Sequence, residues 1–325
     1  MLYSDVSPRT NGYADAMLLK RATPNNILGQ FGQTRTLPKK KTDTIKFRRY
    51  EALSAATTPL SEGVTPTGST LTKTDVSVTL KQFGDYVTIT DKIRDTHEDP
   101  VLNESLEILG EQAAETYDVL RAAILKAGTN VQYGNGSART DVNTVIDATD
   151  LKVAVRTLKR QNAKKITSIV KAGPNIATNP IAGGFIAVCH PDLQRDLEGI
   201  SGWIAEHNYA STQGLIEGEI GSVGEIRFVL DTNLSAWADA GDTKGATIST
   251  TGTDSDVYPV LIFAKNAYAL VPLAGKNAVS TYVNNPKATD SDPLAQRGTV
   301  GWKGYHACVI LNDNFMVRLE VAATS

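Results

Sequence analysis

Residues 54–80 read SAATTPLSEGVTPTGSTLTKTDVSVTL, a stretch that fits neither a buried core nor an ordinary linker. Thr, Ser, Gly and Pro make it too polar to be buried, whereas its end alternates apolar and polar residues from Val76 to Leu80. Such alternation is typical of a half-buried strand. A two-stranded hairpin with no core beneath it is marginal in water and exposes unpaired strand edges. The stretch therefore predicts a projecting arm that needs a surface to dock on.

The flanking segments support this interpretation. TIKFRRY (44–50) predicts a strand before the arm, and DYVTIT (85–90) predicts another after a turn at Gly84-Asp85. Residues 1–40 look extended, and ordering each residue costs about 1–2 kcal/mol. Two projecting segments of this kind indicate a subunit that completes itself on its neighbours. Contacts of that heterologous type generate rings or extended assemblies.

Residues 99–127 predict one long helix. Asp99 suits the N-cap, Pro100 suits the first helical position and Gly128 suits the left-handed C′ position. Two stripes run along the helix. The apolar stripe consists of Leu102, Leu106, Leu109, Ala113, Tyr117, Leu120 and Ile124. The second stripe, the acidic face, consists of Glu104, Glu107, Glu111, Glu115 and Asp118. A helix patterned in this way predicts a spine that crosses the molecule, with a solvated or partner-facing side.

The remainder of the chain predicts an α+β fold. Helix 150–163, strand GGFIAVCH, a short helix from Pro191, and strands EIRFVLD, YPVLIFA and AYALVPL form a compact region over 148–275. The Gly/Thr/Asp-rich loop 235–256 predicts its exposed tip. Residues 304–323 predict a C-terminal hairpin, with a turn at NDN and one buried face.

Composition excludes several protein classes. The chain has 325 residues, 41% hydrophobic and 21% charged, which is typical of a soluble globular protein. It has neither an apolar run long enough to span a bilayer nor a secretory signal pattern at its start. Two distant cysteines in apolar runs, Cys189 and Cys308, favour a reducing compartment. We therefore expect the chain to fold in cytoplasm.

Charge is uneven along the chain. A net charge of −2 argues against a dedicated nucleic-acid reader. One stretch nevertheless carries seven positive residues against Asp43 alone; this basic segment consists of Arg35, Lys39, Lys40, Lys41, Lys46, Arg48 and Arg49. Such asymmetry indicates contact between segments or with a polyanion.

No constellation for catalysis, a cofactor or a metal is evident. His97, His190, His207 and His306 are scattered, and the adjacent Cys189-His190 pair cannot grip one metal. Metal-binding, phosphate-binding and nucleophile motifs are absent. We expect no enzyme activity, no cofactor and no metal site.

The order of elements carries a resemblance. The stretches LPKKKTDTIKFRRYEAL, TPLSEGVTP, KQFGDYVTITD, GEIGSVGEIRFV and DPLAQRGTVGWKGYHACVILNDNFMVRLEVAA occur in sequence from residue 37 onward. In their order and spacing they resemble the major capsid protein of tailed double-stranded DNA bacteriophages, in the subfamily typified by phage N-four. The resemblance runs over most of the chain from about residue 28.

The resemblance implies a division of the chain. Residues 1–40 would be the N-arm, 41–95 peripheral-domain strands with the extended loop at 54–80, and 96–147 the spine helix and a connecting loop. Residues 148–275 would be the axial domain, and 276–325 would return to the peripheral domain as a C-terminal hairpin. The loop residues expected to reach a neighbour are Glu62, Val64, Thr65, Pro66, Leu71, Lys73, Val76 and Val78.

The implied partners follow from that role. They are other copies of the chain in hexamers and pentamers, packaged double-stranded DNA contacted non-specifically, separate scaffolding and portal proteins, and optional decoration proteins, with no membrane. The implied location is the virion capsid, assembled in the host bacterial cytoplasm. The basic segment would contact either DNA or the acidic face of a neighbour; the modest net charge favours the neighbour. No spacing supports a covalent link between Lys73 and Asn284-Asn285.

Three alternatives stay open at this point. An encapsulin-type shell around a cargo enzyme shares the fold, but those shells replace the long N-arm with a short helix. An enzyme built on the α+β region lacks a catalytic constellation. A fibre or adhesin subunit is suggested only by Thr/Gly richness and is contradicted by the long helix.

Overall fold

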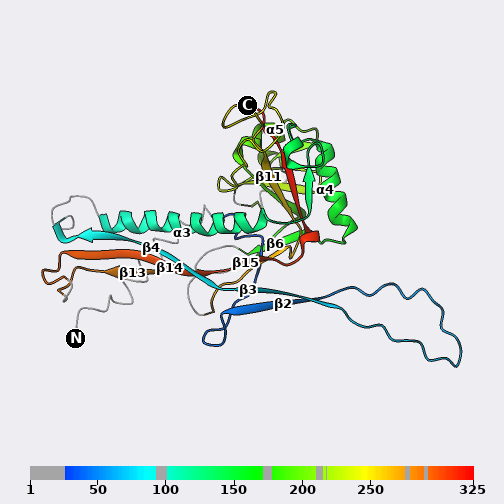
Figure 1. Cartoon of the computed structure of the whole chain (residues 1–325), viewed down its shortest axis with the longest axis horizontal. Helices are drawn as coiled ribbons and strands as arrows, with labels where there is room; N and C mark the ends of the chain where they lie inside the picture. Colours follow the sequence, from blue (N-terminus) through cyan, green and yellow to red (C-terminus); the bar gives the residue numbers. More distant parts are fainter. Residues whose placement is uncertain are drawn as a thin grey trace.

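The computed structural model describes residues 26–92, 101–170, 178–209, 215, 216, 218–274, 279–288 and 292–325. The molecule has an elongated part built on a long helix and a sheet, and a compact α/β part at one end of that helix (Figure 1). A thin hairpin projects away from both parts, and the C-terminus lies at the outer end of the α/β part.

The elongated part is a helix laid on a three-stranded sheet. Helix α3 (Val101–Leu125) runs along β13 (Val279–Asn284), β14 (Arg297–His306) and β4 (Lys81–Thr90), which pair antiparallel in that order. The apolar stripe of the helix packs on the inner face of the sheet, as its spacing predicts. This core contains Ile89, Leu106, Leu109, Ala113, Tyr117, Val279, Val283, Val300 and Trp302.

The two helix ends differ from the sequence prediction. The expected cap residues Asp99 and Pro100 lie outside the described residues. Gly128 does not adopt the left-handed conformation expected after the last turn. Glycine is required here for steric reasons, because a Cβ at position 128 would overlap the Cε of Met316. The glycine therefore permits close packing of the helix end on the α/β sheet.

The expected turn at Gly84-Asp85 is absent. Strand β4 is continuous and pairs with β14 along its whole length, from Lys81 opposite His306 to Thr90 opposite Arg297. Gly84 lies opposite Lys303, where a Cβ would come within 2.5 Å of the carbonyl oxygen of Trp302. Here glycine marks a close approach of two strands, not a chain reversal.

The α/β part is an eight-stranded mixed sheet. Its order is β5 (Val131–Tyr133), β16 (Met316–Val321), β11 (Tyr258–Phe263), β7 (Thr178–Cys189), β10 (Ile226–Leu230), β9 (Glu219–Val223) and β8 (Trp203–Ala205), with β6 (Ile166–Val170) paired to β7. Helices α4 (Ala148–Arg160) and α5 (Gln194–Glu198) pack on one face through Leu151, Leu158 and Leu197. The C-terminal end of α3 and residues 28–31 pack on the other face. Short 3-10 turns are η2 (Arg139–Asp141), η3 (Pro191–Leu193), η4 (Glu206–Asn208) and η5 (Asp313–Phe315).

The expected C-terminal hairpin is wrong. Strand β15 (Cys308–Ile310) pairs with β12 (Tyr268–Leu270), whereas β16 pairs antiparallel with β11 and parallel with β5. Within 276–325, β13 and β14 therefore lie in the sheet under α3, whereas β16 joins the α/β sheet. Every residue of β16 is buried, because apolar clusters cover both faces of this inner strand.

A small third sheet carries the projecting hairpin. It has the order β1 (Gln33–Thr34), β12 and β15. Strands β2 (Thr44–Tyr50) and β3 (Lys73–Thr79) pair antiparallel and pack on it through a cluster around Phe47. The predicted strand 44–50 is confirmed at both ends.

Candidate intersubunit surfaces

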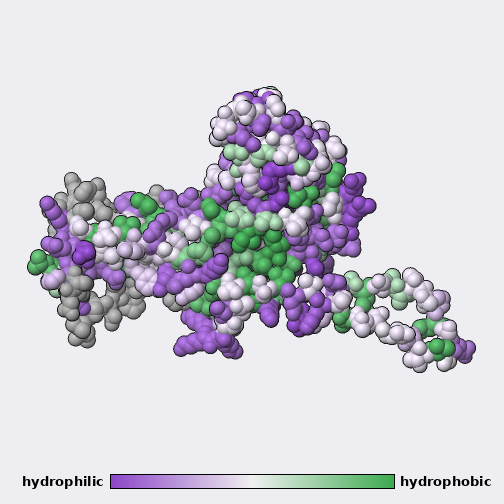
Figure 2. Space-filling view, viewed as in Figure 1, coloured by the Kyte–Doolittle hydropathy of each residue, from purple (hydrophilic) through white to green (hydrophobic). Residues whose placement is uncertain are grey.

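The projecting hairpin ends in a long open loop. Between β2 and β3, every residue from Glu51 to Thr72 is exposed; we call residues 51–72 the arm loop. Its two legs are joined at the base by a hydrogen bond from the Glu51 N–H to the Thr72 carbonyl at 3.0 Å. Figure 2 shows the arm loop standing clear of the body, with apolar patches along it. Glu62, Val64, Thr65, Pro66 and Leu71, which the sequence analysis expects to reach a neighbour, all lie in this loop.

The arm loop carries large apolar side chains that are exposed to solvent. None of the other described residues of the chain covers them. Leu60 is 78% exposed, and Val64 and Leu71 are each 65% exposed. Tyr50 and Leu53 at the base are more than half exposed as well. Burying a Val or Leu side chain is worth about 1.5–3 kcal/mol, so this surface favours association.

The base of the hairpin belongs to the body instead. Val76 and Val78 face Phe47 and Ile45 across the strand pair, and all four pack against the small sheet. Of the residues expected to reach a neighbour, Val76 and Val78 are therefore used within this chain. The predicted alternation in this stretch docks the arm on its own subunit, while Lys73 stays exposed at the start of β3.

The basic segment spreads over the outer surface of this base. Lys39, Lys40 and Lys41 are exposed in the turn before β2, and Lys46 and Arg48 lie on the outward face of β2. Arg48 binds Asp75 on β3 through two contacts of 2.8 and 3.1 Å. This pairing raises the pKa of Arg48 and lowers the pKa of Asp75. The Arg35 guanidinium lies 5.7 Å from the centre of the Phe47 ring, and Arg49 is exposed.

The predicted acidic face is only partly exposed. Glu104 and Glu115 are exposed on α3, and Glu107 and Glu111 are half-buried. Asp118 departs from the prediction, because it is fully buried and points into the junction between α3 and the α/β part. The acidic face available to a partner therefore ends at Glu115.

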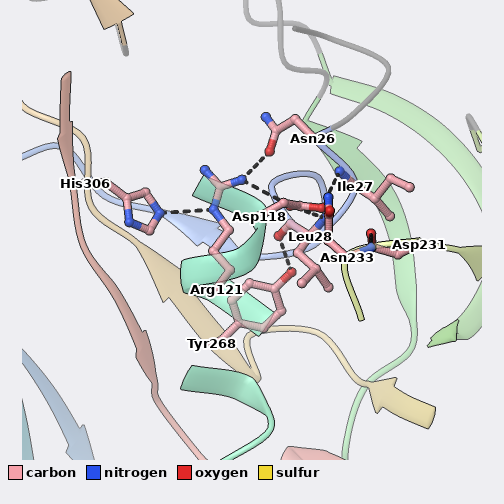
Figure 3. A network of polar contacts seen from close by, with 9 residues as sticks. All are labelled: Asn26, Ile27, Leu28, Asp118, Arg121, Asp231, Asn233, Tyr268 and His306. Carbon is pink, nitrogen blue, oxygen red and sulfur yellow. Dashed lines mark hydrogen bonds and ion pairs between the residues drawn. The ribbon is translucent and has the colours of Figure 1, made fainter. Parts of the chain in front are cut away.

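Asp118 lies at the centre of a buried polar network, the junction cluster, which Figure 3 shows. Its carboxyl accepts the N–H of Leu28 at 3.1 Å and of Ile27 at 3.3 Å. Arg121, one turn further along α3, donates to Nε2 of His306 at 3.0 Å and to the side chain of Asn26. Tyr268 donates its hydroxyl to the Leu28 carbonyl at 2.6 Å. Sequence reasoning missed this cluster, since the helical spacing of Asp118 from Glu111 and Glu115 made it look like one more surface acid.

A second junction anchors the loop 235–256. The Trp237 ring is covered by the guanidinium of Arg139 at 3.7 Å and by the Lys126 ammonium at 4.5 Å. Arg139 binds Glu320 on β16 through contacts of 2.7 and 2.8 Å. Burial and the neighbouring Arg139 and Arg318 lower the pKa of Lys126. One end of the loop expected to be an exposed tip is therefore fixed to the sheet.

The open face of the β13-β14-β4 sheet, opposite α3, is hollowed. Gly84 and Gly301 form its floor, and Tyr86 and Tyr282 stand exposed on its sides. The Lys303 ammonium lies 5.0 Å from the centre of the Tyr282 ring. A groove of this shape can accept an extended segment with small or apolar side chains.

The described residues contain no group of three or more His, Cys, Asp or Glu side chains that could hold a metal ion. Cys189 and Cys308 are buried free thiols whose pKa burial raises to about 12. His190 accepts the N–H of Asp192 at the start of η3, consistent with a strand-to-helix junction. Among the helices described here, none is both long and apolar enough to cross a membrane.

The chain is similar in sequence to known capsid proteins. A family model described as phage capsid protein matches residues 73–319. The major capsid protein of Pseudomonas phage KPP21 is 23% identical over 269 residues, which is 75% of this chain and 66% of that protein, just under two thirds of its length.

Solved structures are similar over nearly the whole chain. The capsid of Ralstonia phage GP4 matches with a TM-score of 0.66 at 14% identity, covering 90% of this chain and 87% of that one. The holo-SrpI encapsulin complex from Synechococcus elongatus PCC 7942 matches with a TM-score of 0.56 at 8% identity, covering 90% and 86%. The fold is therefore one that phage capsids and an encapsulin share.

Proposed function

The chain belongs to the phage capsid protein family, whose members are structural shell proteins and not enzymes, and from that premise we propose that it is the major subunit of a closed icosahedral shell. The observation that carries the proposal is the arm loop. It is fully exposed, bears apolar side chains and stands on a base that is itself packed on the body. Such a loop gains its missing contacts when it lies on another copy.

The geometry of the arm suits contact with a neighbour. Each leg of the arm loop reaches roughly 35 Å, at about 3.3 Å per residue. The rigid base fixes the direction in which the loop leaves the subunit. Because an arm of one copy meets a different surface on the next, the contact is heterologous and closes into rings. Hexamers and pentamers of this chain are the rings we propose.

We further propose that the groove on the open face of the β13-β14-β4 sheet receives the arm loop of the neighbouring copy. The groove offers Tyr86 and Tyr282 to the apolar side chains of the loop, and Lys303 to Glu62. The other acid of the loop, Glu51, accepts the hydroxyl of Thr74 at the base. An aromatic-lined site with one cation complements that loop in both shape and charge.

The basic segment is proposed to pair with the exposed part of the acidic face on a neighbour. Lys39, Lys40, Lys41 and Lys46 lie at the surface beside the arm base, and Glu104 and Glu115 lie at the surface of α3. Such pairs are weakened by salt, since the screening length is about 8 Å at physiological ionic strength. The competing role is non-specific contact with packaged DNA. Changing Lys39, Lys40 and Lys41 to Gln distinguishes the two roles, because the first predicts defective assembly and the second predicts normal shells with defective packaging.

Three finer assignments are also proposed. The α/β part would gather around the capsomer axes as the axial domain, with β5 and β16 included in it. The subfamily would be that typified by phage N-four, supported by the order of the stretches quoted above. The shell would assemble in the host cytoplasm with separate scaffolding and portal proteins, enclosing double-stranded DNA.

An encapsulin-type shell is the second candidate, since the fold alone is compatible with it. The family match and the curated relative favour the phage role. The content of purified shells from the native source distinguishes them. Packaged DNA supports the capsid assignment, whereas a single enriched enzyme supports the encapsulin assignment.

The arm can be removed without disturbing its base. Residues 52–71 are replaced by Asn-Gly, which suits a two-residue hairpin turn between strands already joined at Glu51 and Thr72. We expect a folded subunit with an unchanged unfolding temperature that forms no shells by electron microscopy. The matched control is Leu60→Ile with Leu71→Ile, which keeps the loop and its apolar character. Normal shells from the loop-deleted chain would contradict the proposal.

A further inference from the structure

The junction cluster joins three parts of the chain that are distant in sequence. Asp118 lies on α3, Asp231 follows β10 in the α/β part, and residues 26–28 lead in from the N-terminal side (Figure 3). Asp118 is the shared element, because its carboxyl binds the N–H groups of Ile27 and Leu28 from within the helix. Whatever changes the charge of Asp118 therefore acts on all three parts at once.

Asp231 leaves one buried acceptor without a donor. Its Oδ1 accepts the N–H of Asn233 at 2.9 Å, whereas its Oδ2 is buried and has no hydrogen-bond partner within the described part of the chain. The carboxyl groups of Asp118 and Asp231 are near enough for each to influence the pKa of the other. A proton on Asp118 would supply the missing donor and would remove one of two adjacent buried negative charges.

The surroundings supply one positive charge for the two carboxyl groups. Arg121 lies 3.5 Å from Asp118 and is also engaged by His306 and Asn26. His306 accepts the Arg121 proton at Nε2, so it is neutral, and burial beside Arg121 lowers its pKa to about 3. The other titratable groups that act on the pair are Tyr268 on β12, Cys189 on β7 and His190 after it, and Cys308 on β15 lies near Arg121. Charge balance around Arg121 therefore favours one proton between the two carboxyl groups.

We propose that Asp118 and Asp231 share one proton and act as a pH-sensitive latch that holds residues 26–28 and the α/β part to the spine helix. With the proton in place, Asp118 donates to Asp231 and still accepts the two N–H groups. When the proton leaves, two negative charges face each other in a buried site with a single arginine. The junction then loosens, and residues 26–28 are released before the rest of the fold.

The sign of the pH dependence follows from the direction of the shift. Burial, with the nearby Asp231 charge, raises the pKa of Asp118 to about 7, above its value in an unfolded chain. The native state therefore holds a proton that the unfolded state has lost, and stability is present at low pH and declines as pH rises from about 4 to 7. Each pH unit in that window changes the unfolding equilibrium constant by about tenfold per proton.

The test compares the full-length wild-type chain with Asp118→Asn. An asparagine amide can donate to Asp231 permanently, so the variant copies the latched state and has no proton to lose. Urea unfolding of both is followed from pH 4 to 8, with hydrogen exchange of the Ile27 and Leu28 amides normalised to their intrinsic rates. As pH rises from 4 to 7, we expect the unfolding equilibrium constant of the wild type to increase about tenfold more per pH unit than that of the variant. The Ile27 and Leu28 amides should lose protection from exchange only in the wild type.

Two controls keep the test decisive. Asp141→Asn makes the same change at a carboxyl outside the cluster whose pKa is lowered by the N–H groups of Ser137 and Ala138, so its pH dependence between 5 and 8 should match the wild type. If Asp118→Asn does not fold, Asp231→Asn removes the same shared proton, because its amide can donate to Asp118. Infrared spectra of the wild type at pH 6 should show a buried protonated carboxyl that either variant abolishes. Equal pH dependence in wild type and variant, or no such carboxyl band, would overturn the proposal.

Discussion

Phe47→Ala should detach the arm from the body while leaving the rest of the fold intact. Phe47 is 7% exposed and is the largest side chain of the cluster that packs β2 and β3 on the small sheet. Removing a buried Phe costs about 3–5 kcal/mol, and the lost contact with the Arg35 guanidinium adds about 0.5–1 kcal/mol. Since 1.4 kcal/mol is a factor of ten, the base should open on the order of 10²–10⁴-fold more often.

The assay is native-state hydrogen exchange resolved by segment. We expect faster exchange in 44–50 and 73–79, with unchanged exchange in α3 and in β11, because those elements belong to other clusters. Phe47→Leu is the matched control, since it keeps most of the buried volume. Uniformly faster exchange across the chain would refute the reasoning, because it would show that the base is not a separate unit but part of one cooperative core.

Three further predictions concern the body. Trp302→Ala should destabilise the chain by about 3–5 kcal/mol in chemical unfolding, because Trp302 fills the core under α3 and donates to Gln112 at 3.1 Å; a loss under 1 kcal/mol would contradict this packing. Gly84→Val should destabilise by about 1–3 kcal/mol and reduce protection of β4, since its Cβ would press on the Trp302 carbonyl, and an unchanged melting temperature would refute the close approach. His306→Gln should remove the contribution of His306 to the pH dependence, a loss of about 1.4 kcal/mol per pH unit as pH falls from 6.5 toward 3. In the wild type this loss offsets the opposite contribution of Asp118, so the variant should gain stability on acidification relative to the wild type. The reason is that the lowered pKa keeps native His306 neutral while the unfolded chain takes up a proton, and identical acid titrations would count against it.

Local patterns were sufficient for most of the elements. The spacing of apolar residues predicted α3 and its buried stripe, alternation predicted β2, and short apolar runs predicted the central strands of the α/β sheet. The arm loop was predictable because a long Thr/Gly/Pro stretch between two strands can neither be buried nor be a tight turn. These features depend on neighbours in the sequence.

The errors concern features that depend on distant residues. Gly84 was interpreted as a turn, but it is glycine because of the Trp302 backbone, which lies far away in the sequence. Strand β16 was assigned to a hairpin because it follows β15 closely, yet its partners are β11 and β5. Pairing partners of a strand are not encoded in its own alternation, so proximity in sequence was a poor guide.

The same limit applies to the candidate surfaces. The arm loop residues and the exposed glutamates of α3 were identified from local composition. Asp118 was not, because a buried carboxyl and a surface carboxyl have the same helical spacing. A lone acid beside the apolar stripe, three residues before Arg121, was the only available signal for the junction cluster.

The most direct test of the central claim is the structure of an assembled shell of this chain, determined by electron cryomicroscopy. The account predicts that residues 51–72 of each copy lie on the neighbouring copy, with Leu60, Val64 and Leu71 buried there. A closed shell in which those three side chains remain exposed, or contact only their own subunit, would contradict it.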